Sequence, residues 1–83
     1  MNRPTIKEIR SSPAYKMFSD LSFVLETPII NNKITFFNTE SCVYIDFDLL
    51  KKSFYCGWND EPAGVDMHTL ECINVFCYFL GFI

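Results

Sequence analysis

The chain has 83 residues, a formal net charge of -3 and 49% hydrophobic residues, a composition that describes one small, mildly acidic domain spanning residues 1–83. At this length a single core is possible and a second domain is excluded. The 17% aromatic content argues against a disordered chain, and the negative charge argues against a basic protein that binds nucleic acid directly.

The two ends of the chain predict neither export nor membrane insertion. Residues 1–10 contain two arginines, a lysine and a glutamate, and they lack the apolar run of a signal peptide. The most apolar stretch, residues 72–83, would span only about 18 Å as a helix, against roughly 30 Å of bilayer hydrocarbon. We therefore expect a cytoplasmic protein with no membrane partner.

Two helices are expected in the first third of the chain. Thr5 and Glu8 have the spacing of a capping box, which predicts a short helical turn. Ser12 followed by Pro13 predicts the start of a second helix, with serine as its N-cap. An apolar stripe follows at three- and four-residue spacing, through Ala14, Met17, Phe18, Leu21, Val24 and Leu25. This helix is expected to end at Thr27, because a residue before proline is disfavoured in the α region.

The middle of the chain changes to the two-residue alternation that is typical of β-strands. Strands are expected over residues 34–37, 42–48 and 53–58. The pair Asn31-Asn32 tolerates positive φ angles and is expected to form a tight hairpin turn before the first strand. Residues 59–64 are dense in turn formers and are expected to be a loop.

The alternation is clearest in residues 42–48, which predicts a strand with one buried face and one acidic face. Three apolar residues point one way, namely Val43, Ile45 and Phe47. The residues between and after them point the other way, namely Tyr44, Asp46 and Asp48. We expect the second set to lie on the outer face of the sheet.

The last segment is compatible with a helix or a strand. Asp66 is a good helix N-cap and Gly81 suits the left-handed position after a helix. The inner stripe of that helix would be Leu70, Ile73, Phe76, Cys77 and Leu80. The β-branched and aromatic residues of the segment would also suit a strand, but the two caps favour the helix.

The fold class predicted from these elements is α+β in a small single domain. It has an N-terminal helix or helices, a three-stranded or four-stranded antiparallel sheet, and a C-terminal helix packed on one face of that sheet.

The four cysteines are expected to be reduced and mostly buried, because nothing in the sequence suggests an oxidising compartment. Cys56, Cys72 and Cys77 would make a zinc set with His68, but only His68 and Cys72 have a suitably close spacing. Two core thiols and a histidine in the first turn of the C-terminal helix are the simpler interpretation. Cys56 is expected to be the most exposed thiol, yet no nucleophile motif surrounds it. We therefore expect no metal, no cofactor and no enzymatic activity.

The charge distribution is the feature that points to a function. Residues 1–33 carry five basic and three acidic groups, whereas residues 34–83 carry two lysines and seven acids. Tyrosine and tryptophan, which dominate binding hot spots, are interleaved with those acids. The candidate partner-binding residues are Tyr44, Asp46, Asp48, Tyr55, Trp58, Asp60 and Glu61. An ordinary solvated face is the competing interpretation, and Asp46 with Asp48 as an acid–base or cation pair is the less favoured one.

The predicted function is a non-enzymatic inhibitor. Size and acidity alone place the chain in the broad class that includes phage anti-defence proteins and bacterial immunity proteins. Its acidic and aromatic face would dock on a basic surface of a larger protein that handles nucleic acid. The alternative is a self-associating structural or regulatory domain, a homodimer with no such partner. Nine phenylalanines in so short a chain would leave apolar surface exposed for that contact.

Overall fold

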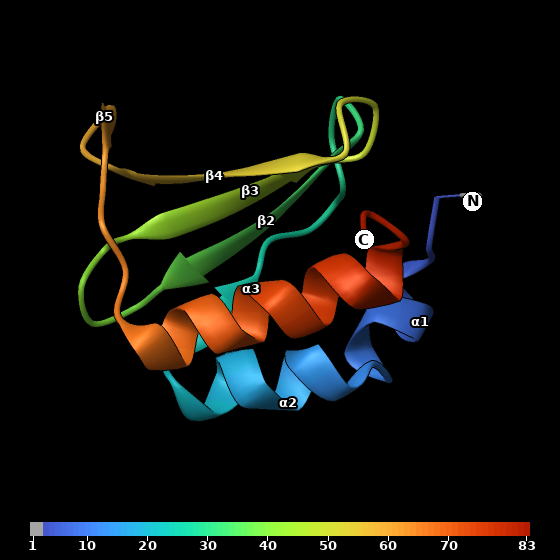
Figure 1. The fold of residues 1–83 in the computed structure, drawn as a ribbon, viewed down its shortest axis with the longest axis horizontal. Helices are drawn as coiled ribbons and strands as arrows, with labels where there is room; N and C mark the ends of the chain where they lie inside the picture. The colour runs from blue at the N-terminus through green and yellow to red at the C-terminus, as the bar shows by residue number, and fades with distance from the viewer. Residues whose placement is uncertain (1–2) are drawn as a thin grey trace.

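A five-stranded antiparallel sheet with helices against one of its faces makes up the computed structural model, which describes residues 3–83 (Figure 1). The elements in chain order are α1 (Ile6–Arg10), α2 (Pro13–Asp20), β1 (Phe23–Leu25), β2 (Lys33–Asn38), β3 (Tyr44–Asp48), β4 (Ser53–Trp58), β5 (Glu61–Pro62) and α3 (Met67–Leu80). The strands follow one another across the sheet in sequence order. The α+β class is confirmed, and the expected three or four strands are an undercount.

The short helix α1 begins with the capping box expected from its sequence. The Glu8 backbone N–H donates to the Thr5 hydroxyl at 3.1 Å, and the Thr5 backbone N–H donates to the Glu8 carboxylate at 2.9 Å. Two N–H groups that a helix start leaves unpaired are thereby satisfied. The helix can then place Ile9, which is fully buried, in the hydrophobic core.

Helix α2 begins at Pro13 as expected but ends at Asp20, well before Thr27. The chain turns at Ser22, whose φ is 69°, and continues as β1, where the sequence predicted a further helical turn. The apolar residues of this segment suit a helical stripe and a strand equally, so pairing decides the outcome. Val24 lies opposite Phe37 of β2, and that long-range ladder replaces local helical hydrogen bonds.

Two asparagine-rich turns have the positive φ angles of tight two-residue hairpins. Asn31 and Asn32 have φ values of 56° and 57°, which confirms the first predicted turn. Asn59 and Asp60 have φ values of 51° and 64° and reverse the chain between β4 and β5. The expectation that residues 59–64 form a loop throughout was therefore wrong, because this turn returns the chain along the β4 edge.

The C-terminal segment is a helix, and the strand interpretation was wrong. The Asp66 carboxylate accepts a hydrogen bond from the Thr69 backbone N–H at 2.8 Å, and Gly81 ends the helix with a φ of 78°. Four of the five expected inner residues are buried, but Leu70 is 41% exposed. Its place is taken by Thr69 and Cys72. No helix within residues 3–83 is long and apolar enough to cross a membrane.

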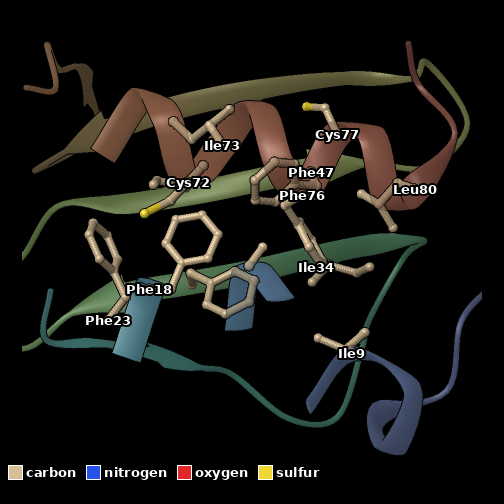
Figure 2. Packing of buried hydrophobic residues seen from close by; sticks show 13 residues of the cluster. Ile9, Phe18, Phe23, Ile34, Phe47, Cys72, Ile73, Phe76, Cys77 and Leu80 are labelled. Carbon is tan, nitrogen blue, oxygen red and sulfur yellow. The ribbon is translucent and has the colours of Figure 1, made fainter. Parts of the chain in front are cut away.

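The core lies between the sheet and the helices and is built from phenylalanine rings (Figure 2). The Phe76 ring of α3 is 4.7 Å from the Phe47 ring of β3 and 5.3 Å from the Phe36 ring of β2, both nearly edge-on. Phe18 of α2 stacks on Phe36 at 4.4 Å. Edge-to-face and stacked rings add to the free energy of burial, so this cluster joins both layers.

Replacing Phe76 by alanine tests the role of this cluster. We expect the Phe76→Ala variant to lose about 3–5 kcal/mol of unfolding free energy, because a ring-sized cavity opens between sheet and helix. The matched Tyr78→Ala variant, in the same helix but 76% exposed, should unfold almost like the wild type. Urea unfolding followed by circular dichroism measures both, and similar losses would contradict this account of the core.

Candidate partner-binding site

One face of the sheet is left uncovered by the helices (Figure 1). In β3 the side chains of Ile45 and Phe47 are buried on the helix side, while Tyr44, Asp46 and Asp48 are only half-buried on the other side. This is the alternation expected from the sequence. We call this uncovered side the open face.

The strand register brings two tyrosines together on the open face. Tyr55 of β4 lies opposite Asp46 of β3, which is two residues from Tyr44 and on the same face. The two tyrosine rings are 6.1 Å apart and tilted by 44°. Partial burial raises the pKa of the Tyr44 phenol, and the nearby Tyr55, Asp46 and Asp60 raise it further. A tyrosine hydroxyl is protonated at neutral pH even at its ordinary pKa, so Tyr44 can donate a hydrogen bond to a partner.

Gly57 is the cross-strand partner of Tyr44 and lies beneath its ring. A Cβ atom at this position would overlap the ring carbons and the hydroxyl of Tyr44. A glycine inside a strand often marks a position where another group packs directly against the backbone, and here that group is the Tyr44 ring. The sequence alone did not reveal this role for Gly57, because it depends on the pairing of β3 with β4.

The two carboxylates of β3 already have hydrogen-bond partners within the chain. The Thr35 hydroxyl donates to Asp46 at 2.6 Å. Asp48 accepts from the backbone N–H groups of Leu50 and Lys51, both at 3.0 Å. The two hydrogen bonds to Asp48 hold the β3–β4 turn in place and identify Asp48 primarily as a turn residue.

The charge of Asp48 is also partly compensated by its neighbours. Hydrogen bonds from the turn backbone lower its pKa, with Lys51 and Lys33 adding to the effect. Lys33 is its cross-strand partner on β2. This end of the open face is therefore of mixed charge rather than acidic.

The structure does not bring all the candidate residues onto one face. By strand alternation Trp58 lies on the helix side, like Cys56, and is 49% exposed at the sheet edge. Glu61 is its cross-strand partner. The candidates on the open face are Tyr44, Asp46, Asp48 and Tyr55, with Asp60 close enough to influence the Tyr44 phenol.

Charge is separated between the two ends of the molecule (Figure 1). The β2–β3 loop, the β4–β5 turn and the start of α3 lie at one end, which we call the acidic end, with the end of α2 below them. Its acids are Asp20, Glu40, Asp60, Glu61, Asp66 and Glu71. They include Glu40 and Asp66, which line a groove between the β2–β3 loop and α3.

The opposite end of the molecule, which we call the basic end, holds α1 and the β3–β4 turn. Its basic residues are Arg3, Lys7, Arg10, Lys33, Lys51 and Lys52. The basic end also holds the acids Glu8 of α1 and Asp48 at the β3–β4 turn. The division in space differs from that along the sequence, because Lys51 and Lys52 belong to the acidic half of the sequence and Asp20 to the basic half. The open face runs from one end to the other.

The cysteines are not arranged as the disfavoured zinc alternative would require. Cys72 and Cys77 are buried and point to different sides of α3 (Figure 2), and burial raises the pKa of both thiols. Among residues 3–83, no three or more His, Cys, Asp or Glu side chains are grouped to hold a metal ion. Cys56 is half-buried with a raised pKa, so its expected exposure was wrong, and Cys42 is the exposed thiol.

Gly57→Ala is expected to lower the unfolding free energy by about 1 kcal/mol or more, because the new methyl group displaces the Tyr44 ring. In a Tyr44→Ala background the same substitution should cost little. Gly64→Ala is the matched control, since nothing lies within 4 Å of the position of its Cβ. Urea unfolding of the four-member cycle checks this, and equal losses in both backgrounds would show that the ring does not lie over Gly57.

The lowered pKa of Asp48 predicts that part of the unfolding free energy is lost in acid. A carboxylate whose folded pKa lies below its unfolded value stabilises the protein above that unfolded value, and the contribution disappears as the pH falls. Between about pH 5 and about pH 3, the wild type should therefore lose more stability than Asp48→Asn, which accepts hydrogen bonds without titrating. Unfolding at a series of pH values measures the difference, and parallel curves would contradict it.

Comparison with known proteins identifies no relative of this chain. No family model matches the chain, and neither a curated protein nor a solved structure matches it. The functional argument therefore rests on the open face and on the charges at its two ends.

Proposed function

We propose that this chain is a non-enzymatic protein-binding domain that inhibits a larger protein by docking on its basic, nucleic-acid-binding surface. The observation that carries the proposal is the pair of tyrosines on the open face, with the carboxylates of Asp46 and Asp60 near Tyr44. Tyrosine supplies a large contact area at a low entropic cost. Carboxylates beside it complement the lysines and arginines that would otherwise bind phosphate.

The separation of charge supports one orientation of docking. An acidic end approaches a basic surface, while the basic end is repelled from it, so the encounter is steered before contact. Asp60, in the β4–β5 turn, lies near enough to influence the Tyr44 phenol, so the acidic end adjoins the tyrosine pair. We therefore centre the proposed contact on Tyr44, Asp46, Tyr55 and Asp60, with Glu61 and Trp58 at its margin.

Asp48 contributes less to this contact than its position in the sequence suggested. Its carboxylate accepts two backbone hydrogen bonds and lies near Lys33 and Lys51. A test that reverses its charge would also disturb the β3–β4 turn. Asp46 is the better probe, because an asparagine there keeps an acceptor for the Thr35 hydroxyl.

The test is a capture experiment with matched variants. Tagged protein is incubated with lysate of the source organism or its host, and bound proteins are eluted with rising salt and identified by mass spectrometry. We expect a stoichiometric partner with a nucleic-acid-binding surface, released by salt and displaced by added nucleic acid. The Asp46→Asn and Tyr55→Ala variants should release that partner at lower salt, or fail to hold it.

The control alters a tyrosine in the helix layer. Tyr78 is an exposed residue of α3 and lies outside both the open face and the acidic end, so the Tyr78→Ala variant should capture the partner like the wild type. A partner held equally by all three variants would contradict docking through the open face. A partner that nucleic acid does not displace would contradict inhibition at a phosphate-binding surface.

A further inference from the structure

We propose that two copies of this chain pair antiparallel through the free edge of β4, about a two-fold axis at Phe54, and join their sheets into one. This proposal is independent of docking through the open face. It rests on three features of β4: the part of its edge that β5 leaves uncovered, its composition, and the charges at its two ends.

The edge of β4 is covered over only part of its length. β5 pairs with Gly57 and Trp58, and the last hydrogen bond along this edge runs from the Ala63 N–H to the Cys56 carbonyl at 3.0 Å. Backbone groups of alternate residues point to the same edge, so Phe54 directs its N–H and C=O outward as Cys56 does. Within residues 3–83, no strand pairs with this edge beside residues 53–55.

The composition of β4 lacks the features that usually protect an edge. Such strands are commonly blunted by charged side chains or by proline. β4 reads Ser-Phe-Tyr-Cys-Gly-Trp and has neither. Phe54 and Tyr55 are each 42% exposed, so the free backbone groups are flanked by aromatic surface. An edge of this kind favours pairing with another strand.

The charges flanking β4 identify a second copy as its partner. Lys51 and Lys52 precede the strand, and Asp60 and Glu61 follow it. In an antiparallel pair of identical strands the start of each strand lies next to the end of the other. With the two-fold axis at Phe54, the turn that carries Lys51 and Lys52 of each copy lies next to β5 of the other copy, which begins at Glu61, so lysines and an acid approach twice in the same interface.

The charges that flank β1, the other edge strand, disfavour pairing with a second copy. β1 is preceded by Asp20 and followed by Glu26, so two copies paired through β1 would bring acids against acids. Like charges placed across paired strands are destabilising. The isologous pairing that charge supports is therefore the one through β4.

The alternation of side chains sets the register. Residues directly opposite one another in an antiparallel pair lie on the same side of the sheet. Phe54 then lies opposite Phe54 of the second copy, and Tyr55 lies opposite Ser53. This register uses the uncovered part of the edge and stops where β5 begins. The helix layers of both copies lie on one side, and their open faces form one continuous surface.

Sedimentation equilibrium over a range of concentrations tests the pairing, with the full chain and no partner present. We expect the mass to rise towards twice that of one chain. Phe54→Pro removes the outward N–H and places a ring in the edge without breaking the ladder with β3. It should raise the dimer dissociation constant about tenfold or more, as expected for two lost hydrogen bonds. Phe54→Thr keeps the N–H and should weaken the dimer less.

Charge exchange gives a second test that does not depend on Phe54. In a dimer of the Lys51→Glu/Lys52→Glu variant, the new acids of each copy meet the acids that follow β4 in the other copy. In a dimer of the Asp60→Asn/Glu61→Lys variant, the new lysine of each copy meets Lys51 and Lys52 of the other copy. Each variant alone should be monomeric at concentrations where the wild type dimerises. An equal mixture of the two should recover the dimer, because opposite charges then meet at both ends of the pair.

Several outcomes would overturn the proposal. One is a wild type that stays monomeric at its highest soluble concentration. Another is a dimer that tolerates Phe54→Pro when circular dichroism shows a folded variant, or charge variants that do not restore the dimer when mixed. Growth beyond a dimer would indicate heterologous pairing of β1 with β4 and would also contradict it. If Phe54→Pro does not fold, the charge exchange decides.

Discussion

Four phenylalanine rings, from α2, β2, β3 and α3, meet at one point between the sheet and the helices, and the arrangement of the chain follows from that contact. They are Phe18, Phe36, Phe47 and Phe76. Each buried ring contributes about 1.5–3 kcal/mol relative to exposure. A chain of this length can bury only about 60–65% of its unfolded surface. With its largest rings gathered on one side, the protein has no second layer to cover the other side.

The open face and the β4 edge are two consequences of this one-sided core, and they suit different contacts. The open face offers side chains, namely the Tyr44–Tyr55 pair beside Asp46, and so suits a partner with a basic surface. The β4 edge offers backbone groups around Phe54 and suits another strand. Pairing through the edge leaves Tyr44, Asp46 and Tyr55 accessible and doubles the open face. Both contacts use Asp60 and Glu61, so we expect a dimer to present fewer free acids to a basic partner than a monomer does.

Short-range signals were predictable from the sequence, whereas features that depend on pairing were not. The capping box at Thr5 and the cap at Asp66 each act over one helical turn, so their residues alone indicate them. The end of α2 depends on β1 pairing with a strand more than ten residues away. In the site, alternation placed Asp46 on the outer face, but only the register reveals Tyr55 beside it and Gly57 beneath Tyr44.

Nuclear Overhauser contacts between side chains test the one-sided core most directly. The account predicts contacts from the Phe76 ring to the rings of Phe18, Phe36 and Phe47, whose centroids lie within 6.2 Å of it. It predicts no contact between the Tyr55 ring and any side chain of α2 or α3. Contacts from Tyr55 to either helix would show that the helices cover the open face, and would contradict the architecture on which both proposals rest.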